Sequence, residues 1–193
     1  MLTFIYSTVN AGKTANLLMR SHSCSERNIN FIIFVPEVAS QRDGKNTVCS
    51  RIGFKQKAIS LTPECDPHSI LVENIIKKEE PVNVVFVDES QFLNKKQILS
   101  LNNIVVDLNI PVFAYGLRTD FKGEPFEGST YLMAWADNIE EIVTDAPGNK
   151  KALFNMKTDE TGERLTEGNS IDAGFHYSPV DRETFNLNKF LKD

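Results

Sequence analysis

Residues 2–16, LTFIYSTVNAGKTAN, join an apolar run directly to small and polar residues and to the tripeptide Gly12-Lys13-Thr14. A strand that passes through such a loop into a helix turns successive backbone N–H groups and the positive end of the helix dipole toward one anion. The signature of a phosphate-binding loop is G-x-x-x-x-G-K-[ST], and Ser7 stands here in place of its first glycine. An ordinary strand-to-helix turn with an exposed lysine is the alternative. The segment predicts a nucleotide-phosphate loop made of Asn10, Ala11, Gly12, Lys13 and Thr14.

A second motif lies at residues 84–87, an apolar run that ends in Asp88 and Glu89. A carboxylate at the carboxyl end of a buried strand, beside a phosphate loop, is the Walker B arrangement that holds magnesium. We therefore expect ATP and Mg²⁺ as cofactors, with Thr14 and Asp88 as the magnesium residues. Capping of the next helix is the alternative role of Asp88. Glu89 is expected to act as a general base, either on a substrate hydroxyl or, in an ATPase, on water.

The chain has 193 residues and a formal net charge of −5. This length fits one domain, with or without a small appendage, and the charge argues against a general nucleic-acid binder, which would carry a basic face. No stretch approaches the roughly 20 apolar residues of a membrane span. The three cysteines are odd in number and lack C-x-x-C spacing, which argues against a disulfide framework. We expect a cytoplasmic protein with neither a nucleic-acid nor a membrane partner.

Four apolar runs in the first part of the chain are nearly continuous rather than alternating, as in parallel strands that are covered on both faces. Segments with helical periodicity lie between these runs. Strand and helix in repetition predict an α/β fold in which a P-loop-type parallel sheet is flanked by helices. The predicted strands are residues 2–6, 30–35, 82–87 and 112–115, and the predicted helices are 13–23, 69–78 and 95–108.

Two other segments have weaker patterns. Residues 36–53 are polar and contain Gly44, which favours a loop or a ragged hairpin. Residues 129–136, STYLMAWA, predict a short helix with Trp135 in the core.

The character of the chain changes near residue 144. Pro147-Gly148-Asn149 marks a turn, and residues 154–157 and 171–177 are short strand candidates separated by a Gly-rich polar stretch. We expect a nucleotide-binding domain over residues 1–143 and a small, loop-rich β appendage over residues 144–193.

Residues 113–129, FAYGLRTDFKGEPFEGS, begin as a strand, turn at Gly116 and carry two phenylalanines in an otherwise polar loop. Phe121 and Phe126 are candidates for a base-stacking platform at the carboxyl edge of the sheet. In the alternative interpretation, these rings only hold the loop against the core.

Together these segments resemble the type II thymidine kinases, the family that includes the vertebrate cytosolic and T-even phage enzymes. The resemblance spans nearly the whole chain in the same order and spacing, with a weaker match at a late tyrosine, Tyr177 in GFHYSPV. The matching segments are NAGKT at residues 10–14, SRIG at 50–53, FVDESQF at 86–92 and YGLRTDFKGEPFEGS at 115–129.

The resemblance implies transfer of the ATP γ-phosphate to the 5′-hydroxyl of thymidine, with Glu89 taking the hydroxyl proton. It places Arg51, and also Arg42, in segments that correspond to phosphate-facing arginines. Tyr177 corresponds to a tyrosine of the substrate-covering loop, or lasso, which makes the appendage a lasso-type domain. A homotetramer and feedback inhibition by thymidine triphosphate are further implications. The residues that match the apolar wall around thymine are Phe92, Leu117, Phe121 and Phe126.

One family feature does not match. Members usually bind a structural zinc through two pairs of cysteine or histidine residues, and those positions fall here within residues 145–148, DAPG, and near Asp181 and Thr184. Two carboxylates without cysteine or histidine make a poor tetrahedral zinc site. We expect no structural zinc, with Lys150, Lys151 or Arg182 neutralising the carboxylates of Asp145 and Asp181.

Two alternatives to a thymidine kinase remain at this point. One is a P-loop ATPase in which Glu89 activates water, and the other is a non-catalytic relative that only binds nucleotides. His176 lies beside Tyr177, and we expect it to be solvent-facing or packed rather than a ligand of the substrate.

Overall fold

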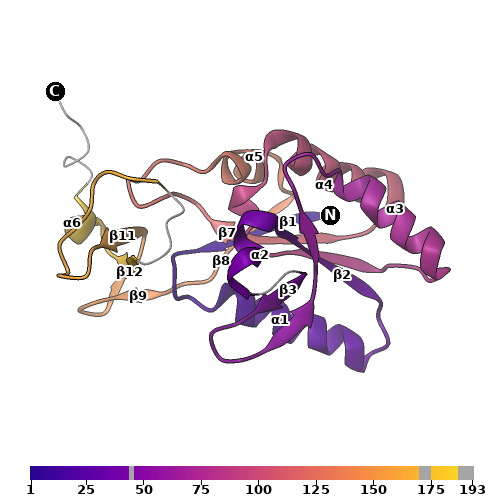
Figure 1. Ribbon diagram of the computed structural model, residues 1–193, viewed down its shortest axis with the longest axis horizontal. Helices are drawn as coiled ribbons and strands as arrows, with labels where there is room; N and C mark the ends of the chain where they lie inside the picture. Colours follow the sequence, from indigo (N-terminus) through magenta and orange to yellow (C-terminus); the bar gives the residue numbers. More distant parts are fainter. Residues whose placement is uncertain (44–45, 170–174, 187–193) are drawn as a thin grey trace.

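The computed structural model describes residues 1–43, 46–169 and 175–186. A six-stranded sheet forms its centre, and every pair of neighbouring strands in that sheet is parallel (Figure 1). The predicted α/β fold with a parallel sheet is therefore confirmed. In spatial order the strands are β5 (Ile59–Leu61), β2 (Phe31–Pro36), β6 (Val84–Val87), β7 (Val112–Leu117), β1 (Leu2–Ser7) and β8 (Asn138–Glu141).

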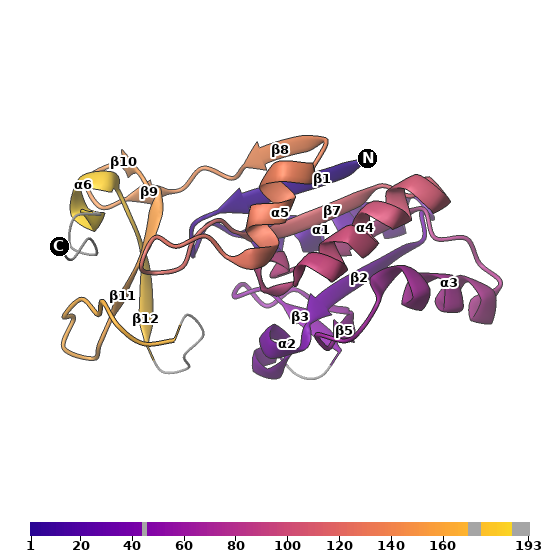
Figure 2. The same cartoon turned by 90° about the horizontal axis from the view of Figure 1, so that it is seen from above.

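Helices cover both faces of this sheet, because successive side chains of its apolar strands feed two separate cores. Phe4 and Phe34 belong to the core on one face, and their neighbours Ile5 and Val35 belong to the core on the other. The first core is covered by α3 (Pro67–Lys78), α4 (Lys95–Leu108) and α5 (Glu127–Trp135), and the second by α1 (Lys13–Glu26) and α2 (Glu37–Asp43) (Figures 1 and 2).

For residues 36–53 the sequence predicts a loop or ragged hairpin, and that prediction is wrong for the first half of the segment. Helix α2 follows β2 directly and buries Ala39 and Ser40 against the second core. A helix of two turns is too short to show clear apolar periodicity, so the sequence pattern does not reveal it. A hairpin of β3 (Thr47–Cys49) and β4 (Lys55–Lys57) does follow.

The end of α5 and the strand after it also differ from expectation. Trp135 is 37% exposed and packs on Tyr131, one turn earlier, rather than in the core. The helix ends at Trp135, and Leu132 is the residue of this last turn that packs in the core. Strand β8 has no counterpart among the predicted strands. Its sequence, NIEE, is polar because it is the outer strand of the sheet and is mostly exposed.

The part of the chain after β8 lies beyond the carboxyl ends of the sheet strands (Figure 2). It contains two antiparallel pairs, β9 (Asp145–Ala146) with β10 (Lys150–Lys151), and β11 (Phe154–Thr158) with β12 (His176–Val180), followed by α6 (Arg182–Phe185). The small β appendage is therefore present. The strand predicted at residues 171–177 falls largely on residues 170–174, outside the described residues, and β12 begins only at His176.

We call the β11–β12 pair the lasso hairpin. Its two faces differ because side chains alternate along a strand. Phe154 and its cross-strand partner Val180 pack with Phe185 of α6 in a small core of their own. Asn155 and Lys157 belong to the opposite face of β11. None of the helices in the described ranges is both long enough and apolar enough to cross a bilayer.

Candidate functional site

The phosphate loop runs from the end of β1 at Ser7 to the start of α1 at Lys13. Gly12 precedes the helix with a φ of 78°, in the left-handed region that glycine adopts without steric cost. Asn10 also has a positive φ, of 64°, which asparagine tolerates better than most residues. This backbone turns the loop into the amino end of α1, as the motif predicts.

The ammonium of Lys13 lies inside the loop. It donates to the carbonyl oxygen of Thr8 at 2.8 Å and to the hydroxyl of Ser7 at 3.1 Å. Burial lowers the pKa of Lys13, while the nearby Glu89 and Asp88 carboxylates raise it. Ser7, which replaces the first glycine of the signature, thus provides a hydrogen-bond partner for the lysine.

Asp88 follows β6, which is separated from β1 by the single strand β7. Its Oδ2 accepts a hydrogen bond of 2.9 Å from the hydroxyl of Thr14, so the two predicted magnesium residues meet. Its Oδ1 is buried and has no hydrogen-bond partner among the described residues. Burial, together with the charge of Glu89, raises the pKa of Asp88 to about 7.

A buried carboxylate oxygen that lacks a donor requires compensation. Hydroxyl and carboxylate oxygens are the hard ligands that Mg²⁺ takes in nucleotide sites, where it keeps several waters and binds substrate phosphates as well. The pair of Thr14 and Asp88 therefore fits magnesium.

Glu89 has a φ of 49°, an uncommon conformation for a residue with a long side chain. Its Oε2 accepts a hydrogen bond of 2.5 Å from Nε2 of Gln91, and Oε1 of Gln91 in turn accepts the backbone N–H of Leu117 at 3.1 Å. Gln91 is buried, and its role was not predicted from the sequence. The sequence feature that could have indicated this role is the position of Gln91, two residues after the expected base Glu89, on the 3₁₀ turn Ser90–Phe92.

Gly116 of β7 makes this arrangement possible. A Cβ at that position would lie 2.8 Å from Oγ of Ser90 and 2.9 Å from Oε1 of Gln91. Any side chain at position 116 would therefore displace the turn that follows Glu89 and carries Gln91.

The predicted thymine-wall residues fall into two groups. Phe92 and Phe126 are half-buried and contact each other edge to face, with ring centroids 5.5 Å apart. Leu117 is half-buried at the end of β7. Phe121 is only 1% exposed, and the Lys157 ammonium lies 4.8 Å from the centre of its ring.

Three predicted residues from distant segments meet at the phosphate loop. The side-chain amide of Asn10 donates to the backbone carbonyl of Tyr177 at 3.4 Å and accepts a hydrogen bond from the guanidinium of Arg51. The hydroxyl of Tyr177 is buried and has no hydrogen-bond partner in the described part of the chain. The backbone of Arg42 lies in α2, but its side chain is outside the described residues. His176 is exposed, in agreement with the prediction for it.

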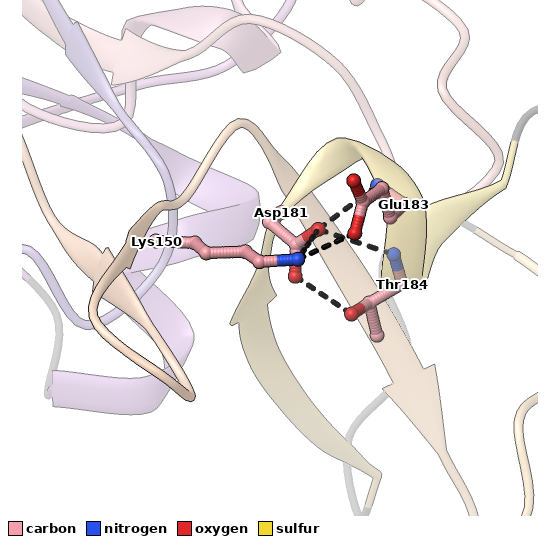
Figure 3. Close-up of polar contacts among 4 residues, drawn as sticks. All are labelled: Lys150, Asp181, Glu183 and Thr184. Carbon is pink, nitrogen blue, oxygen red and sulfur yellow. Dashed lines mark hydrogen bonds and ion pairs between the residues drawn. The ribbon is translucent and has the colours of Figure 1, made fainter.

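The residues at the family's zinc positions do not fit a zinc ion. Asp181 caps α6: it accepts the backbone N–H groups of Glu183 and Thr184 and, at 2.7 Å, the Thr184 hydroxyl, and its pKa is lowered chiefly by that hydroxyl (Figure 3). The Lys150 ammonium lies 4.0 Å from Asp181 and pairs with Glu183. No cluster of three or more histidine, cysteine, aspartate or glutamate side chains in the described ranges is arranged to hold a metal.

The fold and site define the class of protein. A parallel α/β sheet in which a phosphate-loop lysine and threonine meet a Walker B aspartate at its carboxyl edge is a P-loop nucleotide-binding fold. The family model described as thymidine kinase matches residues 1–185, and the chain belongs to that family. The resemblance found in the sequence is thereby confirmed.

Curated relatives agree over nearly the full length of the chain. It is 40% identical to a thymidine kinase of Coxiella burnetii, across 96% of this chain and 95% of that protein. It is 43% identical to a thymidine kinase of Haemophilus influenzae, across 90% and 88%, and 37% identical to one of Legionella pneumophila, across 100% and 97%. The chain is therefore a kinase of this family, and the interpretations as an ATPase or as a non-catalytic binder are not favoured.

Proposed function

We propose that the protein transfers the γ-phosphate of ATP to the 5′-hydroxyl of thymidine, with Glu89 as the general base. The observation that carries this proposal is the convergence of Lys13, Thr14 and Asp88 on one phosphate loop, directly beside the carboxylate of Glu89. Phosphoryl transfer depends on positioning and charge neutralisation, and these side chains supply both.

On the ATP side, the loop from Asn10 to Thr14, including Ala11 and Gly12, offers backbone N–H groups to the phosphates, and Lys13 offers its positive charge. The carboxylate of Asp88 and the hydroxyl of Thr14 would hold magnesium, which neutralises phosphate charge when bound. Arg51 donates a hydrogen bond to Asn10 of the loop, and this contact supports a role for Arg51 beside the phosphates.

On the thymidine side, Glu89 accepts the proton of the 5′-hydroxyl as the hydroxyl oxygen forms a bond to the γ-phosphorus. The bond between the γ-phosphorus and the β–γ bridging oxygen breaks, and ADP leaves. Gln91 holds one carboxylate oxygen of Glu89 and leaves the other for the substrate. A base must lie within hydrogen-bond reach of the proton it takes, so an anchored carboxylate is more effective than a mobile one.

The nucleoside contacts are assigned to Phe92, Leu117, Phe126 and Tyr177, whereas the buried Phe121 contacts the Lys157 ammonium instead. The unsatisfied hydroxyl of Tyr177 is a polar group that a bound nucleoside would satisfy.

We infer that residues 1–143 hold ATP and that residues 144–193 cover thymidine. We also propose a homotetramer by family resemblance, which light scattering of the purified protein tests directly.

The decisive experiment follows thymidine monophosphate and ADP formation with Mg²⁺-ATP. Glu89→Gln is expected to lower kcat by about 10²–10⁴-fold, the usual contribution of a general base, with the Kd for ATP within about twofold of wild type. Glu73→Gln, at an exposed position of α3, is the matched control and should keep full turnover. ATP consumption that does not depend on added nucleoside would show an ATPase, and tight binding of both substrates without product would show a non-catalytic relative.

A further inference from the structure

Asn155 belongs to the lasso hairpin, yet its side chain reaches the phosphate loop. Its Oδ1 accepts the backbone N–H of Val9 at 2.8 Å, although the two residues are 146 positions apart. Its Nδ2 donates to the backbone carbonyl of Thr119 at 3.3 Å. One side-chain amide therefore links the loop after β1 to the loop after β7.

The burial of Asn155 makes this link energetically significant. Asn155 is 4% exposed, so its side-chain amide cannot exchange this hydrogen bond for one to water without cost, and Val9 is half-buried. A buried donor that loses its partner costs about 1–3 kcal/mol. Phe154, Val180 and Phe185 pack together on the opposite face of the same strand, so this small core is separate from the amide contacts.

We propose that Asn155 is a positioning residue for the ATP phosphates, supplied by the part of the chain that covers the nucleoside. By holding Val9, it keeps the phosphate loop between Ser7 and Gly12 in one conformation before ATP binds. A loop that is already ordered does not lose conformational entropy on binding, and this preorganisation raises affinity. The proposal rests on the function proposed above, since it assigns the ATP-binding role to this loop.

Binding of a non-hydrolysable ATP analogue with Mg²⁺, in the absence of thymidine, tests this role by calorimetry. Asn155→Leu keeps the approximate volume and removes both hydrogen bonds. We expect the Kd of the analogue to rise about tenfold, in line with the loss of one buried hydrogen bond. In steady-state assays, the KM for ATP should rise by a similar factor, while the KM for thymidine changes less than about twofold.

Val180→Ala is the matched control, because Val180 belongs to the same hairpin but packs with Phe154 and Phe185 on its other face. It should lower the stability of the hairpin and leave the Kd of the analogue within about twofold of wild type. Should Asn155→Leu not yield folded protein, Asn155→Ala makes the same test with less steric demand.

Two results would overturn the proposal. One is an unchanged or lower Kd for the ATP analogue in Asn155→Leu, and the other is an equal rise in Kd for Val180→Ala, which would reveal general loosening. Wild-type protein that binds the analogue without phosphorylating thymidine would instead contradict the proposed function, and would leave the role of Asn155 in the phosphate loop measurable by the same titration.

Discussion

Gln91 donates from Nε2 to Oε2 of Glu89 at 2.5 Å, while its own Oε1 accepts the backbone N–H of Leu117 at 3.1 Å. The carboxylate of the proposed base is thus tied to the end of β7, the same strand end from which the Phe121 and Phe126 loop departs. The orientation of the base and the start of the nucleoside wall depend on one buried amide.

The substitution Gln91→Leu should therefore lower kcat about 10–100-fold, because Glu89 loses its orienting partner while the phosphate loop keeps its own contacts. The Kd for ATP should stay within about twofold of wild type. Product formation at saturating substrates and equilibrium binding of ATP measure the two effects separately.

Gln97→Leu is the control for this prediction. Gln97 is also a buried glutamine, but it closes the capping box of α4 with Asn94, away from the phosphate loop. It should cost stability, on the order of 1 kcal/mol, without affecting kcat. Equal kcat for Gln91→Leu and wild type would refute the orienting role.

Asp88 gives the metal-free protein a predictable pH dependence. Its folded pKa, raised to about 7 by burial and by Glu89, lies above the value of about 3.9 expected in the unfolded chain. Its contribution to stability is therefore fully present below pH 4 and is lost as the pH rises to 7 and above. Because a tenfold difference in proton affinity between the folded and unfolded chains corresponds to about 1.4 kcal/mol, the total loss is on the order of a few kcal/mol.

Urea unfolding in EDTA between pH 5 and pH 8.5 measures this effect. Wild type should lose stability over this range relative to Asp88→Asn, which keeps an acceptor for Thr14 but carries no charge. Millimolar Mg²⁺ should recover stability at pH 8 in wild type only. Parallel pH profiles for the two proteins would show that Asp88 does not titrate in this range.

Lys157 is 1% exposed, and its ammonium lies 4.1 Å from the ring centre of Phe175, 4.8 Å from that of Phe121 and 6.0 Å from that of Tyr177. It also donates to the backbone carbonyl of Asn169 at 3.3 Å. Phe121 and Tyr177 are among the predicted nucleoside residues, and the Lys157 ammonium contacts both rings. Because desolvated cation–π contacts contribute about 2 kcal/mol, the loss of this charge in Lys157→Met should displace the rings and raise the KM for thymidine about tenfold.

Lys157→Arg, which keeps the charge, should recover part of that loss, whereas a purely steric role would be filled equally well by methionine. Lys151→Met is the exposed control, since Lys151 pairs only with Glu141 among the described residues. A KM change for ATP larger than that for thymidine would contradict a role of Lys157 in positioning the Phe121 and Tyr177 rings for the nucleoside.

The small β appendage should be insensitive to zinc chelation, because Asp181 is engaged as the cap of α6 (Figure 3). The Phe154 and Phe185 rings, whose centroids lie 4.3 Å apart, also stack in this part of the chain. Thermal unfolding with and without a zinc-selective chelator should give the same Tm, and elemental analysis should find no stoichiometric zinc. A Tm that falls on chelation would show a metal site that this donor set does not account for.

Two substitutions separate the cap from the ion pair in the same appendage. Asp181→Ala should cost about 1 kcal/mol, as the loss of an N-cap usually does. Lys150→Met should leave the urea midpoint almost unchanged, since both Lys150 and Glu183 are exposed and such pairs are screened by solvent. Urea unfolding followed by the Trp135 and tyrosine fluorescence measures both.

The sequence by itself determined the features that depend on neighbouring residues. The apolar runs of β1, β2, β6 and β7 predicted a parallel sheet, because a strand buried on both faces must be apolar throughout. The phosphate loop and Asp88 were predicted for a similar reason: Gly12, Lys13 and Thr14 bind an anion through the backbone of one short segment. Helix α4 was predicted with its observed bounds, since its periodicity is strong.

Only the tertiary structure decided which distant side chains meet. Asn155 on Val9, Lys157 on Phe121 and Gln91 on Leu117 are contacts between elements whose sequences carry no sign of each other. In the sequence, a polar strand residue that is buried against another element cannot be distinguished from one that faces solvent. Alternation along the strand shows which face a side chain is on, but not what packs against that face. For the same reason the polar edge strand β8 and the exposed Trp135 could not be inferred from pattern alone.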